Sequence, residues 1–252
     1  MRWLNEWVLV NLIIALASLL QAITGFGFAI MATPFLLLVI DSRECIQISI
    51  FLSFFIAGVM VPKIKADIDW LLLKRLSAGS LAGAPAGLWL FVSLPVNTVK
   101  VFVAVTVLIV ALFALFSRPR LLAGQEEGLL KRYRAWIETA VGFASGLLTA
   151  SIGMPGVPLA MYFAQGHLGK EQIRSTTLAF FVVIYTVSMV LQGVAGQIYS
   201  QTVLSSLGLV PAALLGIVAG DRLFGKLNQQ RFRLLVNVIL LYTGLHMLSS
   251  VL

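Results

Sequence analysis

The stretch QAITGFGF, residues Gln21–Phe28, interrupts a run of apolar residues that extends from about residue 4 to residue 40. Gly25 and Gly27 tolerate backbone conformations that other residues avoid, and Pro34 cannot donate to a helical hydrogen-bond ladder. The apolar residues on both sides of the glycines favour helices. The stretch therefore predicts a helix that stops and then restarts within apolar surroundings.

The whole chain is too apolar for a soluble protein. Of its 252 residues, 60% are hydrophobic and 11% are charged, and its mean hydropathy is +0.99. A soluble domain carries roughly 25% charged residues. So few charges cannot cover a surface that faces water. The composition predicts an all-α integral membrane protein whose surroundings are the lipid bilayer.

Ten apolar segments follow one another along the chain, each of which could be a helix. The second and seventh are near or below the lower limit of about 17 residues for a membrane span, and each follows a glycine-rich break. We expect these two to be short or re-entrant, and the sequence does not distinguish the two cases. The segments cover residues 4–23, 28–40, 45–61, 70–92, 98–116, 135–151, 157–166, 173–196, 203–221 and 232–251.

The second break resembles the first, which indicates an internal duplication. It reads TASIGMPGVP, residues Thr149–Pro158. Four of eight positions match between Ser18–Gly25 and Gly146–Gly153, and six of eighteen match between Ala86–Val103 and Ala219–Val236. The two matches occur in the same order along the chain, as a repeated unit requires. We therefore expect two halves of five helical segments each.

The basic residues indicate how the halves are oriented. If each half crosses the membrane five times, 15 of the 18 basic residues lie on one side and three on the other, whereas four crossings per half would divide them 10 to 8. The positive-inside rule favours five crossings, with both termini outside the cytoplasm. An odd number of crossings makes the second half inverted relative to the first. The predicted parts are an N-terminal repeat (1–116), a cytoplasmic basic linker (117–134) and an inverted C-terminal repeat (135–252).

Paired broken helices in inverted halves are the best sequence indication of a transporter's binding site. A restarting helix presents free N–H groups and a partial positive charge, which suit a small anion. The alternative is that the glycines and prolines only permit a kink or close packing, and that Ser and Thr bond back to their own helix. The predicted substrate-binding residues are Gln21, Thr24, Gly25, Phe26, Gly27, Phe28, Thr149, Ser151, Gly153, Met154, Pro155 and Gly156.

Other kinds of site lack the residues they would need. Cys45 is the only cysteine, and His167 and His246 are far apart in sequence, so we expect no metal site, no cofactor and no catalytic residues. The acidic residues fall in loops or near segment ends, including Glu138, so coupling through an intramembrane carboxylate has no evident position. We expect Asp221 and Arg222 to form a solvated ion pair at a helix end, with a gating role as the alternative. The net charge of +8 follows from the basic loops, so nucleic acid is not an expected partner.

The two breaks resemble those of the TauE/SafE family, also called the sulfite exporter family. The resemblance extends over about residues 8–250 and lies in the Gln-Ala-x-Thr-Gly-Phe-Gly-Phe motif and the later Gly-x-Pro-Gly-x-Pro motif. It implies a membrane transporter for sulfite, sulfonates or other small, often sulfur-containing, organic anions. The family motif falls on Gln21, Thr24, Gly25, Phe26 and Gly27, and on Gly153, Pro155, Gly156 and Pro158. Met154-Pro155 stands where many relatives have another glycine, so the backbone of the second break is expected to differ.

Together these observations predict a secondary transporter for a small organic or sulfur-containing anion such as sulfite, taurine, isethionate or sulfoacetate. It would reside in the cell inner membrane as a multi-pass protein and work by alternating access, with Phe26, Phe28 and Met154 lining its path. The alternatives are an anion channel of the same fold, a membrane-embedded enzyme, or an assembly subunit without transport. Whether the protein forms a homodimer is left open.

Overall fold

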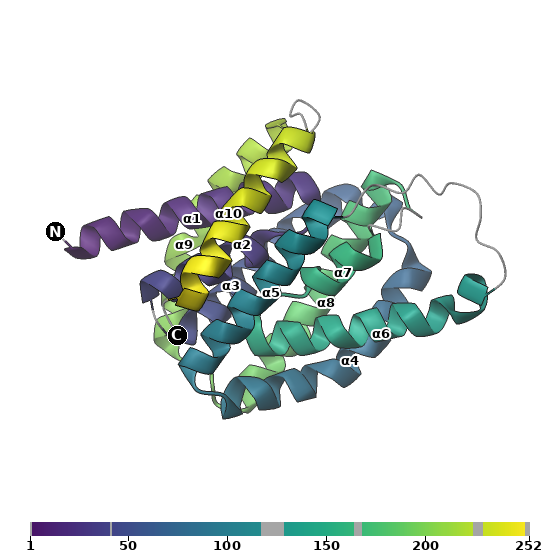
Figure 1. Cartoon of the computed structure of the whole chain (residues 1–252), viewed down its shortest axis with the longest axis horizontal. Helices are drawn as coiled ribbons and strands as arrows, with labels where there is room; N and C mark the ends of the chain where they lie inside the picture. The colour runs from purple at the N-terminus through teal and green to yellow at the C-terminus, as the bar shows by residue number, and fades with distance from the viewer. Residues whose placement is uncertain (1, 41, 117–128, 164–167, 224–228, 250–252) are drawn as a thin grey trace.

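The computed structural model describes residues 2–40, 42–116, 129–163, 168–223 and 229–249, and within them the chain forms ten α-helices, one 3-10 turn (Lys65–Asp67) and no strand (Figure 1). The all-α prediction is confirmed, and each predicted segment corresponds to one helix. The helices of the first half are α1 (Arg2–Thr24), α2 (Phe28–Ile40), α3 (Glu44–Ile64), α4 (Trp70–Ser93) and α5 (Val96–Phe116). Those of the second half are α6 (Leu129–Ile152), α7 (Gly156–Phe163), α8 (Lys170–Val194), α9 (Ser200–Leu223) and α10 (Gln229–Ser249).

The predicted linker agrees only in part with the helix boundaries. Residues 117–128 lie outside the described part of the chain, as do Gln165 and His167. Residues 129–134 belong to α6, so this helix begins six residues before the predicted segment. Charged residues can extend a helix beyond its apolar span, because their side chains reach the interfacial region. Hydropathy locates the span and not the full helix.

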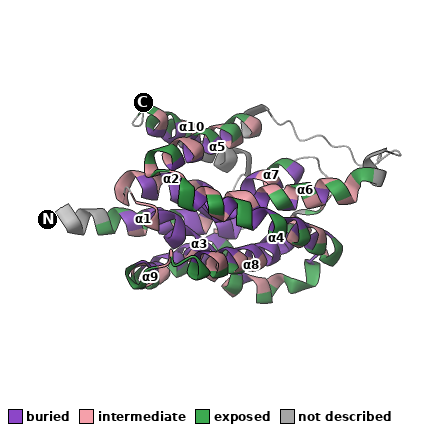
Figure 2. Cartoon of the chain, turned by 90° about the horizontal axis from the view of Figure 1, so that it is seen from below, coloured by how far each residue is buried: buried purple, intermediate pink, exposed green. Residues whose placement is uncertain are grey.

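Two of the helices are too short to cross a bilayer upright. α2 has 13 residues and α7 has eight, which correspond to about 20 and 12 Å of helix, against about 30 Å of hydrocarbon. Seven of the longer helices are long and apolar enough to span the membrane: α1, α3, α4, α5, α6, α8 and α9. The outer faces expose large apolar side chains, among them Trp89, Trp136 and Leu215, while buried residues gather towards the middle (Figure 2). The chain is a multi-pass membrane protein.

Glycines set the closest helix contacts. Gly79, Gly83 and Gly87 lie at four-residue intervals on α4 and face the backbone of α6, where a Cβ on Gly83 would lie 2.1 Å from the carbonyl oxygen of Phe143. On α9, a Cβ on Gly216 would lie 2.2 Å from the carbonyl oxygen of Ala15 in α1. Small residues at this spacing let membrane helices pack backbone against backbone, where dispersion rather than hydrophobicity drives association.

These close pairs connect the two predicted halves. α1 packs on α9 and α4 packs on α6, so the first helix of each half lies against the fourth helix of the other. α3 packs on α8, and α5 packs on α10, which lies beside it in Figure 1. A duplicated chain with an internal two-fold axis would have this pattern of partners. The inverted relation of the halves itself stays a prediction.

Candidate functional site

The first break is a tight turn between α1 and α2. Gly25 and Gly27 have φ angles of +83° and +120°, which side chains with a Cβ rarely adopt. The hydroxyl of Thr24 is 2.8 Å from the carbonyl oxygen of Leu20, also bonds to the carbonyl of Phe26, and accepts from the N–H of Phe26 at 3.3 Å. In this conformation, therefore, Thr24 holds the turn together.

The second break separates α6 from α7. Gly153 has φ +75°, and its N–H donates to the carbonyl of Thr149 at 2.9 Å, while the N–H of Met154 donates to the carbonyl of Leu148 at 3.2 Å. The hydroxyls of Thr149 and Ser151 bond back to carbonyls of their own helix, at 2.5 and 2.7 Å. These two predicted donors therefore bond within their own helix, which is the alternative to substrate binding that we considered for Ser and Thr.

The two breaks meet each other. A Cβ placed on Gly156, the first residue of α7, would lie 3.5 Å from Cβ of Phe26 and 3.7 Å from Ile30 of α2. A Cβ there would also lie 3.6 Å from the ring of Phe181 on α8. Phe28 and Met154 are fully buried beside the same turns. Residues predicted from two distant stretches of sequence therefore form one region.

Each break is held by a long helix of the other half. Gly25 lies against Arg174 in the first turns of α8, and Gly153 lies against Ile46 and Ile50 in the first turns of α3. α3 and α8 are thus the helices that position the two turns. The sequence predicted the turns, but it did not predict that these helices contact them, because nothing in the α3 and α8 segments indicates which residues approach a break.

Gln21 is the most unusual polar residue of the region. Its side chain is 0% exposed, and neither its amide oxygen nor its amide nitrogen has a hydrogen-bond partner among the described residues. Its backbone carbonyl accepts from the N–H of Gly25 at 2.8 Å, so it lies one turn before the break. A buried amide without partners costs about 1–3 kcal/mol. Such an amide can bond to a ligand or to an ordered water.

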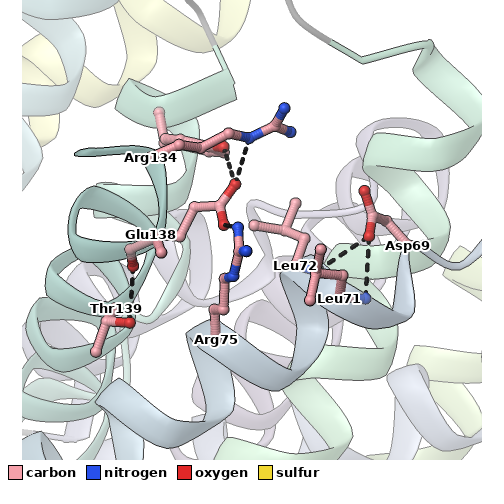
Figure 3. Close-up of polar contacts among 9 residues, drawn as sticks. Asp69, Leu71, Leu72, Arg75, Arg134, Glu138 and Thr139 are labelled. Atoms are coloured by element: carbon pink, nitrogen blue, oxygen red, sulfur yellow. Dashed lines mark hydrogen bonds and ion pairs between the residues drawn. The ribbon is translucent and has the colours of Figure 1, made fainter. Parts of the chain in front are cut away.

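A buried carboxylate lies between α4, α6 and α7 (Figure 3). Glu138 is 1% exposed and bonds to Arg75 at 2.7 Å, to Arg134 at 2.8 Å and to the hydroxyl of Tyr162 at 2.7 Å. Its place near the start of a segment is as expected, but its burial was not anticipated. Its partners lie 63, four and 24 residues away, so the sequence gives no sign that they meet.

A second charged cluster surrounds the end of α1. Asp221, in the last turn of α9, lies 2.8 Å from Arg174 and 3.9 Å from Lys63. The expected pair with Arg222 is replaced by these two contacts from α8 and α3. Lys63, Arg174 and Asp221 belong to three predicted basic loops or their edges, so the structure gathers these loops at one end of the molecule.

The comparison with protein families decides the identity of the fold. The model named Sulfite exporter TauE/SafE matches residues 10–247. The chain belongs to the TauE/SafE family. No curated protein and no solved structure matches it significantly. At the level of the family, this TauE/SafE protein is a membrane transporter of the sulfite-exporter type rather than an enzyme.

Proposed function

We propose that this TauE/SafE protein is a secondary transporter that moves a small sulfur-containing or organic anion across the cell inner membrane by alternating access. The meeting of the two helix restarts at Phe26 and Gly156 carries the proposal. The substrate would be sulfite or a sulfonate such as taurine, isethionate or sulfoacetate.

The starts of α2 and α7, which follow the two breaks, offer backbone N–H groups as hydrogen-bond donors without a side-chain charge. The first intrahelical bond of α2 runs from the N–H of Met31 to the carbonyl of Gly27, so the amides of Phe28, Ala29 and Ile30 precede it. α7 begins at Gly156, beside α2. Two helix N-termini that point partial positive charge at one region favour an anion there. The buried amide of Gln21 adds a donor next to the same turn.

The helix partners bear on how access would alternate. Rocking one whole half against the other would separate α1 from α9 and α4 from α6, where backbones touch at Gly216 and Gly83. Separating such interfaces would lose the dispersion contacts that hold the helices together. We therefore propose that the moving units are mixed, one containing α1 and α9 and the other α4 and α6, with the short helices between them.

Counterflow in proteoliposomes tests the function. Purified protein is reconstituted with an unlabelled anion inside, and uptake of labelled sulfite, taurine, isethionate and sulfoacetate is followed against protein-free vesicles. Saturable uptake that depends on the internal anion is expected from a carrier, whereas flux that rises linearly with concentration would indicate a channel. The absence of movement for every anion would refute the proposal.

A further inference from the structure

Three residues with hydroxyl groups follow one another near the start of α8, and the last differs from the other two. The hydroxyl of Ser175 donates to the carbonyl of Gln172 at 3.1 Å. The hydroxyl of Thr176 accepts from the backbone N–H of Asp69 at 2.9 Å. Thr177 is 0% exposed, yet its hydroxyl has no hydrogen-bond partner within the described part of the chain. Threonine in a helix commonly bonds back to the preceding turn, so this buried hydroxyl needs another explanation.

Helix geometry places Thr177 between the two breaks. Arg174 lies about one turn before it, and a Cβ on Gly25 of the first break would lie 2.8 Å from Cα of Arg174. Phe181 lies about one turn after it, and its ring would lie 3.6 Å from a Cβ on Gly156, where α7 begins. Residues three or four apart share one face of a helix. Thr177 therefore lies on the face of α8 that contacts both breaks, and at a height between the two contacts.

The corresponding position of the first half has a partner for its hydroxyl. α3 contacts the glycine of the second break through Ile46, and Ser49 follows three residues later, as Thr177 follows the contact of α8 with the first break. The hydroxyl of Thr33 in α2 donates to Oγ of Ser49 at 3.0 Å. Thr33 lies five residues after the start of α2, and five residues after the start of α7 the chain has Met161, which has no hydroxyl. The hydroxyl at the equivalent place in the second half is thus left without a partner.

The surroundings of Thr177 suit an anion. α2 and α7 begin at the two breaks, where their first N–H groups and partial positive charge favour negative charge. A threonine hydroxyl adds a donor that can rotate towards a ligand. The oxygens of a sulfite or sulfonate group accept hydrogen bonds, so they match both kinds of donor.

We propose that the hydroxyl of Thr177 donates a hydrogen bond to the anionic head of the substrate between the two breaks. This inference rests on the proposed transport function and adds a binding residue that lies outside both glycine-rich motifs. Because the hydroxyl makes no bond within the described protein, it contributes to substrate affinity and not to folding. Loss of the hydroxyl therefore has opposite consequences for binding and for stability.

Thr177→Val tests the proposal, because it removes the hydroxyl and nearly keeps the shape of the side chain. The KM for uptake of labelled sulfite and labelled taurine into proteoliposomes is expected to rise by about 10- to 100-fold, as for the loss of one hydrogen bond to a charged group. The melting temperature without substrate is expected to stay the same or rise. Thr186→Val is the matched control on α8: its exposed hydroxyl bonds back to the carbonyl of Val182 at 2.7 Å, so KM should not change.

Thr177→Ser and Thr177→Ala provide a second comparison, since both lack the methyl group and only the serine variant keeps the hydroxyl. The serine variant is expected to have a KM close to that of the wild type, and the alanine variant a KM as high as that of Thr177→Val. An unchanged KM in the two variants without a hydroxyl would overturn the assignment. It would also be overturned if only the serine variant folded, because the hydroxyl would then be structural. Wild-type protein that moves no anion would refute the transport function instead.

Discussion

Single residues determine whether the two turns can form. At Gly25 the φ angle of +83° and the approach of Arg174 both exclude a side chain. The sequence predicts this glycine's role, because Gly25 and Gly27 stand together within the apolar run and are followed by Pro34. Arg174 could not be predicted as its neighbour, since 149 residues separate the two and only the packing of α8 brings them together.

Gly25→Ala is expected to destabilise the protein by about 1–3 kcal/mol from the backbone angle alone, and further through overlap with Arg174. Gly169→Ala is the control, because no atom of the described residues lies within 4 Å of a Cβ there and its φ is −65°. Thermal unfolding in detergent, followed by loss of the monodisperse chromatographic peak, measures both. Equal melting temperatures for the two variants would contradict the described turn.

Gln21→Leu is expected to raise the melting temperature and abolish transport. The substitution removes a buried amide without partners, so the free energy of unfolding should increase while a ligand donor is lost. Gln47→Leu is the matched control: its amide donates to the carbonyl of Gln197 at 2.8 Å, so its loss should lower stability. If Gln21→Leu transports normally, Gln21 is not part of the binding site.

At the scale of helices, the apolar runs of the sequence predict where helices occur better than they predict which helices pack together. All ten segments became helices, yet the four-residue spacing of Gly79, Gly83 and Gly87 identifies only a contact face on α4. Any helix with small residues could have occupied that face. Glu138 is buried because α6 is the helix that packs on this face of α4. The sequence does not indicate that packing, so it could not predict the pairing of Glu138 with Arg75.

Gly83→Ala is expected to disrupt the α4–α6 interface, because its Cβ would lie 2.1 Å from a backbone oxygen that cannot move without shifting the helix. Gly58→Ala on α3 introduces the same methyl group where no atom in the described part of the chain lies within 4 Å, and it should behave as wild type. The yield of folded protein after detergent extraction compares the two. A normal yield for Gly83→Ala would mean that the helices are farther apart.

Glu138→Gln is expected to destabilise the protein more than Tyr162→Phe. The first change removes charge-assisted hydrogen bonds to two arginines, each of which is worth roughly 1.5–3 kcal/mol. The second removes one of three bonds to Glu138, which costs about 1–3 kcal/mol. Melting temperatures measured side by side give the order, and the reverse order would show that the ion pairs contribute little.

For the whole molecule, the distribution of charge predicts orientation. The 15-to-3 division of basic residues predicts that four loops lie in the cytoplasm, namely those between α3 and α4, α5 and α6, α7 and α8, and α9 and α10. Alkaline phosphatase fused after residue 252 should therefore be active, and a fluorescent protein inserted between residues 117 and 128 should fluoresce. An inactive phosphatase fusion would place the C-terminus inside and require an even number of crossings in the second half.

The partnership of α1 with α9 also constrains how the protein is made. About 180 residues separate the end of α1 at Thr24 from the start of α9 at Ser200. At roughly 5–20 residues per second, α1 waits about 10–40 seconds in the bilayer before the ribosome delivers the helix that covers its small-residue face. A nascent chain at that stage has unassembled helices that other membrane proteins or quality-control proteases can engage. α1 therefore stays without its partner until eight of the ten helices have been synthesised.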